Sequence, residues 1–322
     1  KINDEIFRMT ELLDFEWNPM VYADHLELSM LVDREFAPLA ERMKSVLARL
    51  RAYPRVLAVA RQNLRAELDR TIVETSLAAF EGRRTSLDEL AERSFGQLTD
   101  DGLRQELNEA VQSAKLAITS FMDALRTVVL PTARYDSFRL GSELMTKYLR
   151  ASELISTSLE DLLEQGRREM DRLTVELYRT SAKLDATLSP QAAFHQYVEA
   201  DHFTESTVIR ATDAMLERIR TFLIDRDIID VPSEVRCRVT ETPPHMRWAF
   251  AAMNSPGAFE RVATEAFYYI TLPDPTWDAA EREQYMGGLN RSVLEVISIH
   301  EAYPGHYTHF LHLQNVVSKV GK

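Results

Sequence analysis

The sequence predicts a mainly α protein, with a large helical body followed by a small β-region beside a terminal helix. Three observations predict this fold class. Glycine is scarce, at 10 of 322 residues, against an average of about 7% in proteins. Apolar residues recur at steps of three and four over most of the chain before about residue 230, the spacing of a helical face. The pattern changes after about residue 232, where residues 235–240 alternate apolar and polar side chains, which is typical of a strand.

Four stretches show the helical spacing clearly, at 24–50, 101–130, 160–184 and 203–225. The second is followed at once by Pro131, a residue that interrupts helices. Its apolar residues are Leu103, Leu107, Val111, Ala114, Ile118, Phe121, Met122 and Leu125. Because a stripe of this kind normally faces other elements, we expect all four stretches to contribute to the core.

Two short segments in the last third of the chain have the pattern of strands. Residues 235–240 alternate apolar and polar side chains, as a half-buried strand does. Residues 266–272 are rich in aromatic and β-branched side chains, and Pro273 follows them. Helical spacing returns over 279–303. This order predicts strands that lie next to a C-terminal helix.

The charge and hydropathy of the chain exclude two classes of partner. The 38 Lys and Arg residues are outnumbered by 50 Asp and Glu residues, which gives a formal charge of -12. A chain this acidic repels phosphate backbones, so we expect no nucleic-acid partner. The sequence has no run of about 18 apolar residues, and we therefore expect no membrane span.

The cysteine content bears on the compartment. Cys237 is the one cysteine in the sequence, so no internal disulfide can form, which fits a reducing environment. We expect this residue to be a small buried side chain, with a catalytic thiol as the alternative. The predicted location is the cytoplasm. Because the chain begins at Lys1 rather than at Met, export after removal of a signal is the alternative.

Histidines gather near the C-terminal end. Four of the eight, His300, His306, His309 and His312, fall within the last 23 residues, where even scattering would place fewer than one. Such clustering is typical of metal sites, although a helix with several solvated histidines is the alternative. In the zincin arrangement, two histidines one helical turn apart bind zinc, and the Glu beside the first is the general base. The pair His300-Glu301 has this order.

The spacing of His300 and His306 departs from the simple helical pattern. Six residues along an unbroken helix correspond to about 600°, so the two imidazoles would face apart by about 240°. Pro304 and Gly305 lie between them. Proline interrupts the helix and glycine tolerates backbone angles that other residues resist, so the break can return His306 to the side of His300. A plain helix stop is the alternative interpretation.

The segment 300–306, His-Glu-Ala-Tyr-Pro-Gly-His, resembles the signature of the bacterial family called domain of unknown function 885. Members of that family resemble zinc peptidases of the gluzincin type. Weaker similarities to the family occur at 50–55, 138–143 and 239–244, so the resemblance extends over most of the chain. It implies a zincin-like motif helix with zinc as cofactor. It also implies that His300 and His306 are zinc ligands and that Glu301 is the general base.

The resemblance also has departures. The family motif usually continues with a second histidine, whereas this chain has Tyr307. A zincin needs a third protein ligand, and the family implies a Glu in a later Glu-Gly-Trp-Ala-like motif, which the sequence lacks. We expect a further segment or a second chain to supply that Glu, with an incomplete site or His309 as alternatives. His312 is predicted to be a surface or core-edge residue.

These patterns predict two parts and a set of possible substrate contacts. Residues 1–231 are predicted to be a helical N-terminal body, and residues 232–322 a strand region plus metal-site helix, the catalytic part, incomplete at its C-terminus. By analogy with zincins, the strand at 266–272 is either an edge that holds an extended peptide or a core strand. His245 and Arg247 are either contacts to a substrate carboxylate or transition state, or loop surface.

The leading functional hypothesis is a zinc-dependent hydrolase, a peptidase that cleaves short peptides or peptide-like amides with metal-activated water and Glu301 as base. The alternative is a catalytically incomplete helical binding protein that retains the motif for structure. Two histidines and a carboxylate can also hold non-haem iron. Adjacent residues on a helix point about 100° apart, however, which disfavours His300 and Glu301 as ligands of one ion.

Overall fold

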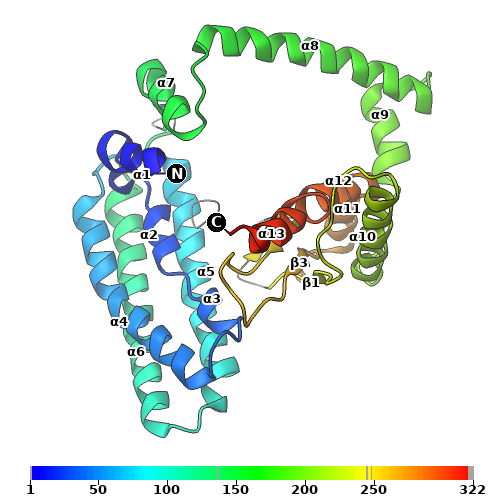
Figure 1. Ribbon diagram of the computed structural model, residues 1–322. Helices are drawn as coiled ribbons and strands as arrows, with labels where there is room; N and C mark the ends of the chain where they lie inside the picture. The colour runs from blue at the N-terminus through cyan, green and yellow to red at the C-terminus, as the bar shows by residue number, and fades with distance from the viewer. Residues whose placement is uncertain (1, 136–137, 244–245, 248, 318–322) are drawn as a thin grey trace. The chain divides into compact units, whose positions relative to one another are not determined.

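The computed structural model describes residues 2–135, 138–243, 246–247 and 249–317 (Figure 1). As predicted, the fold is mainly α with a small sheet of three strands. The chain forms two compact units, residues 1–166 and 167–322. Among the described residues, no helix is long and apolar enough to cross a membrane.

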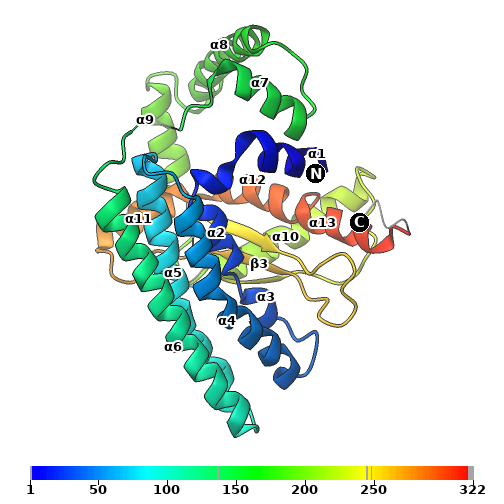
Figure 2. The same cartoon turned by 90° about the vertical axis from the view of Figure 1, so that its left-hand side faces the viewer.

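The first unit is helical. Three long helices, α4, α5 and α6, run side by side in both views (Figures 1 and 2). Short π-helical turns extend α1 and α6 over 8–12 and 125–129. The helices of this unit are α1 (Ile2–Phe7), α2 (Met20–His25), α3 (Ser29–Val32), α4 (Leu39–Asn63), α5 (Arg70–Ser94), α6 (Asp101–Ala124), α7 (Gly141–Ser152) and the first turns of α8 (Leu159–Leu184).

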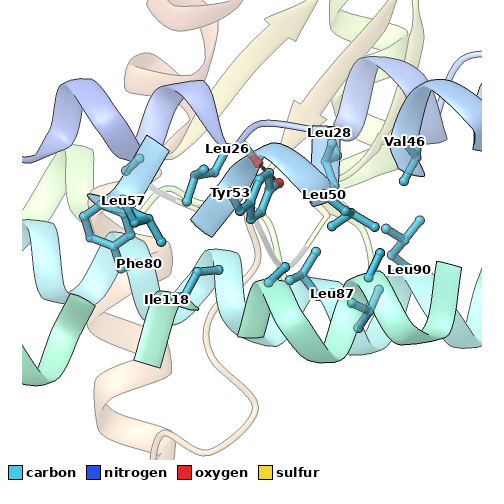
Figure 3. Packing of buried hydrophobic residues seen from close by; sticks show 14 of the residues in the cluster. Leu26, Leu28, Val46, Leu50, Tyr53, Leu57, Phe80, Leu87, Leu90 and Ile118 are labelled. Carbon is cyan, nitrogen blue, oxygen red and sulfur yellow. Dashed lines mark hydrogen bonds between the residues drawn. The ribbon is translucent and has the colours of Figure 1, made fainter. Parts of the chain in front are cut away.

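Caps and a buried stripe explain why α5 and α6 form where they do. Asp69 accepts hydrogen bonds from the first backbone N–H groups of α5, and Asp100 does the same for α6. All eight apolar residues predicted for the stripe over 101–130 are buried, which confirms that prediction. Figure 3 shows the core they join, and in that core the rings of Phe80 and Phe121 meet edge to face at 4.9 Å.

The apolar stripe predicted for 160–184 has a different outcome. This stretch is helical, as α8, but among its side chains only Ser181 is buried. Met170 and Val175, for example, are about two-thirds exposed. The expectation that this stripe lies in the core is therefore wrong for the described residues. Periodicity shows that a helix has an apolar face but does not show what covers that face.

In the second unit, helices pack against a small sheet. A π-helical turn over 195–199 extends α9. The strand order is β1-β3-β2, with β1 parallel and β2 antiparallel to β3. In register, both Val239 of β1 and Met253 of β2 lie beside Tyr268 of β3. The elements are α9 (Pro190–Phe194), α10 (Val208–Asp225), β1 (Arg238–Glu241), β2 (Ala251–Asn254), β3 (Phe267–Ile270), α11 (Ala279–Gly288), α12 (Arg291–Glu301) and α13 (His306–Asn315).

Along the chain, the boundary between the two compact units follows residue 166, within α8, whereas the predicted boundary follows residue 231. The predicted boundary marks the change from helical to strand-like sequence. Helix α10 precedes that change but packs on β1 and α12, and its residues Val208 and Met215 share a buried cluster with Tyr268. A change of sequence pattern does not have to coincide with a change of packing partner. The division at 231 describes the sequence pattern and stays a prediction.

Candidate metal centre

The site is built at a break between two helices. Helix α12 begins at its cap Asn290, whose side chain accepts from the N–H of Val293, and it ends at Glu301. Helix α13 begins at His306. The turn between them is fixed from both sides, because the N–H of Ala302 donates to the Ser298 carbonyl and the Ala302 carbonyl accepts from the N–H of Thr308. The interruption predicted from the Pro-Gly pair is thus present, because α12 ends before this pair and a separate helix, α13, begins after it.

Gly305 is required at this turn by a close approach of backbone. A Cβ atom at position 305 would lie 1.6 Å from the carbonyl oxygen of His300 and 2.6 Å from that of Ile299. Both contacts are far shorter than any that a side chain tolerates, so glycine alone fits the turn. This close approach folds the start of α13 back against the end of α12.

The turn brings the two candidate ligands together. The ring centroids of His300 and His306 lie 4.8 Å apart, with the ring planes at 89°. Together with Glu301 the two imidazoles form a cluster whose ligand atoms all lie within 4.8 Å of one another. Over the described ranges, this is the one cluster of three or more metal-capable side chains. Both histidines are exposed and Glu301 is half-buried, so the donors face solvent.

The carboxylate of Glu301 is held by the sheet. Its Oε2 accepts a hydrogen bond of 2.9 Å from the backbone N–H of Met253 in β2. One turn earlier on α12, Ser298 is buried and its hydroxyl lies 3.1 Å from that of Tyr268 in β3. These two contacts fix the end of α12 on two neighbouring strands. Sequence patterns do not point to Met253, because any residue other than proline can donate through its backbone N–H.

Below the turn lies a buried layer of tyrosines. Tyr303 and Tyr307 pack edge to face with ring centroids 5.6 Å apart. The Tyr307 hydroxyl donates to the carbonyl of Val235, and burial raises the pKa of this hydroxyl to about 12. Tyr307 occupies the position where the family motif usually has a second histidine, and here that side chain anchors α13 to the segment before β1.

The remaining candidate residues lie apart from the cluster. His309 is exposed, and its ring is not in the group that the two imidazoles form with Glu301. His312 donates through Nε2 to the carbonyl of Asp230, which agrees with its expected place at the edge of the core. Arg247 forms an ion pair with Glu241. His245 lies outside the described residues.

Two expectations about other residues have clear outcomes. The strand at 266–272 is present as β3, but it is the central strand, with β1 on one side and β2 on the other. Of the two alternatives for this strand, the core strand is therefore confirmed and the peptide-binding edge is wrong, since its backbone groups pair with both neighbours. The strand next to Glu301 is β2, whose short Ala-Ala-Met-Asn sequence lacks β-branched and aromatic residues. Cys237 is buried and free, as expected for a structural residue.

The fold and the cluster together define a mainly α protein with an open His-Glu-His group on the surface of its second unit. The sequence model of a family described as bacterial protein of unknown function (domain of unknown function 885) matches residues 2–321, and the chain belongs to this family. No curated protein matches the chain.

Two solved structures share the fold. One is described as a lipoprotein of unknown function from Shewanella oneidensis, with 22% identity and a TM-score of 0.70 over 98% of this chain and 58% of that one. The other is described as a lipoprotein from Colwellia psychrerythraea, with 14% identity and a TM-score of 0.63 over 83% of this chain and 48% of that one. The chain therefore spans about half the length of these similar proteins.

Proposed function

We propose that this protein is a zinc-dependent hydrolase that cleaves short peptides or peptide-like amides. The observation that carries the proposal is the meeting of His300, Glu301 and His306 at the helix break, with all ligand atoms within 4.8 Å. Nothing in the spacing alone requires this meeting, because an unbroken helix would turn the two imidazoles apart.

The donor set fits zinc. Imidazole nitrogens are preferred zinc ligands. The ligand atoms of His300, Glu301 and His306 lie within 4.8 Å of one another, and both imidazoles are exposed, so an ion can reach them from solvent. Bound zinc supplies a Lewis acid that lowers the pKa of its water to about 7.

The residues of this chain divide the remaining work. His300 and His306 hold the ion. Glu301 takes the proton from the attacking water, and the N–H of Met253 keeps its carboxylate oriented beside the two imidazoles. A substrate in extended form lies along the outer edge of β2, the strand that contacts Glu301. The family resemblance implies a Glu as third protein ligand, and the described cluster holds no carboxylate besides Glu301.

Two observations favour a second candidate, a helical binding protein without catalysis. The described residues bring only two imidazoles to the cluster, one fewer protein ligand than a zincin uses if Glu301 is the base. Helix α8 also leaves an apolar stripe exposed, which is a surface suited to a partner. This candidate requires that the motif bind no zinc.

Zinc content per chain decides between the two candidates. Elemental analysis of the protein dialysed against zinc and then against buffer should give about one zinc in the wild type and none in His300→Ala. His309→Ala is the matched control, because it removes an exposed histidine of α13 that lies outside the cluster, and it should keep about one zinc. A wild type without zinc would rule out the hydrolase and leave the binding protein.

We also propose that the protein is exported from the cytoplasm. The similar solved proteins are described as lipoproteins, which favours the exported alternative over the cytoplasmic one. Fractionation of the producing bacterium, followed by detection with an antibody, tests this. Recovery with the envelope or the periplasm supports export, and recovery with cytosolic markers contradicts it.

A further inference from the structure

A pocket of about 370 Å³ lies at the start of β2. This volume is at the lower end of the range for ligand pockets, about 300–1,000 Å³, and suits a single large side chain. Most of its wall is aromatic or aliphatic. The lining residues are Arg247, Ala249, Phe250, Thr271, Leu272, Asp274, Trp277 and Tyr285.

The aromatic walls are held in place by contacts with each other. The ring of Tyr285 meets Phe250 at 5.0 Å and Trp277 at 5.5 Å, both edge to face. The Tyr285 hydroxyl donates to the carbonyl of Thr271 at the end of β3. Because three rings and one hydrogen bond fix this wall before any ligand arrives, little ordering is needed on binding.

The two charged residues in the lining already have partners. Arg247 pairs with Glu241, and the Asp274 carboxylate accepts from both the N–H and the hydroxyl of Thr276. These interactions hold the pKa of Asp274 below its usual value. The lining carries one charge of each sign, on Arg247 and Asp274, and these two charges cancel. Its selectivity therefore comes from the apolar wall.

The pocket is connected to Glu301 by β2. The carbonyl of Phe250 accepts from the N–H of Thr271, so the backbone groups of residue 250 point towards β3. Along an antiparallel pair of strands, every second residue directs its backbone N–H and C=O groups away from the partner strand. The backbone groups of Ala251 and Met253 therefore point towards the outer edge of the sheet. The N–H of Met253 indeed leaves the sheet to reach Glu301. Phe250 and Met253 are three positions apart, and at about 3.3 Å per residue the pocket lies about 10 Å along the strand from the carboxylate.

We infer that this pocket binds a large apolar or aromatic side chain of an extended peptide lying along β2, about three residues from the bond at Glu301. The inference rests on the proposed hydrolase for the position of that bond. The expected substrates are peptides with a phenylalanine-like residue at that spacing. The chain's own pocket, rather than the metal, makes this selection.

Three capped peptides test the inference without catalysis. Acetyl-Phe-Ala-Ala-Ala-amide, acetyl-Ala-Ala-Ala-Phe-amide and acetyl-tetraalanine-amide are titrated calorimetrically into the full chain in EDTA. At least one phenylalanine peptide should bind about tenfold or more tightly than tetraalanine, because a buried phenylalanine side chain leaves water. Trp277→Ala, which removes a wall residue that is 39% exposed, should abolish the preference. Ala249→Leu, which fills the pocket, should do the same.

Controls separate this inference from the hydrolase. Ile228→Ala removes an exposed apolar residue outside the pocket and should keep the preference. Zinc content is measured for each variant and should equal that of the wild type. Equal affinity for all three peptides, or a preference that survives in both pocket variants, would overturn the inference even if zinc binds. A phenylalanine preference in a protein that binds no zinc would uphold the pocket while the hydrolase fails.

Discussion

The backbone N–H of Met253 donates a hydrogen bond of 2.9 Å to Oε2 of Glu301, which joins β2 directly to the last residue of α12. The contact places the carboxylate between the sheet edge and the two imidazoles of the cluster. A group held in this way needs little reorganisation before it accepts a proton. In the proposed hydrolase, an extended substrate would lie along β2, the strand that makes this contact.

Glu301→Gln should separate metal binding from catalysis. The glutamine carbonyl oxygen can still accept from Met253, and His300 and His306 are unchanged, so about one zinc per chain should remain. An amide cannot take the proton of the attacking water, and hydrolysis should fall by about 10²- to 10⁴-fold. The measurement is amine release from a mixture of capped tetrapeptides, with zinc content determined on the same samples.

Two results would contradict the role of Glu301 as base. One is a variant that keeps wild-type hydrolysis with zinc bound. The other is loss of zinc from Glu301→Gln, which would make this residue a ligand instead. Ile299→Ala, which removes an exposed side chain of the same helix and keeps both the cluster and the Met253 contact, is the control and should retain activity within a fewfold.

Gly305→Ala should disrupt the turn. The added Cβ would lie 1.6 Å from the His300 carbonyl oxygen, so the backbone must move and the two imidazoles must separate. We expect loss of zinc and a decrease of about 1–3 kcal/mol in the free energy of unfolding, as for overpacked sites. Zinc analysis and urea unfolding measure the two effects. Gly257→Ala, where a Cβ meets nothing within 4 Å, should behave like the wild type.

Much of the candidate site was predictable from the sequence. The order of His300 and Glu301 and the break at Pro304-Gly305 express chemistry that only particular residue types supply, so they can be read without coordinates. Met253 could not be found in this way, because it contributes a backbone N–H that any residue other than proline has. Its role depends on the pairing of β2 with β3, which is a tertiary property.

The fold, too, was predictable from the sequence only in part. The stripe in α6 was predictable because it buries a periodic apolar face. The segment that forms β3 was predictable because it is rich in aromatic and β-branched residues. The four residues of β2 have no such pattern and take their conformation from β3. For α8 the helix was predictable but its exposure was not, since periodicity is the same whether or not a partner covers the face.

Phe80→Ala should destabilise the first unit strongly. Phe80 is fully buried, and its ring packs edge to face on Phe121 (Figure 3). Truncation leaves a cavity in a close-packed core, for which about 3–5 kcal/mol is the usual cost. Urea unfolding followed by circular dichroism measures it. Leu116→Ala on the exposed face of α6 is the control and should change stability by about 0.5 kcal/mol or less.

Cys237 should be unreactive in the folded protein. Burial raises the pKa of its thiol to about 12, so at pH 8 only about one molecule in 10⁴ carries the thiolate that reacts. An ordinary cysteine, with a pKa of about 8.5, carries roughly a quarter at the same pH. Incubation with iodoacetamide at pH 8 and mass spectrometry should therefore show little modification of the native chain and full modification in urea. Rapid labelling of the native protein would show that the thiol is accessible and would reopen the catalytic alternative for this residue.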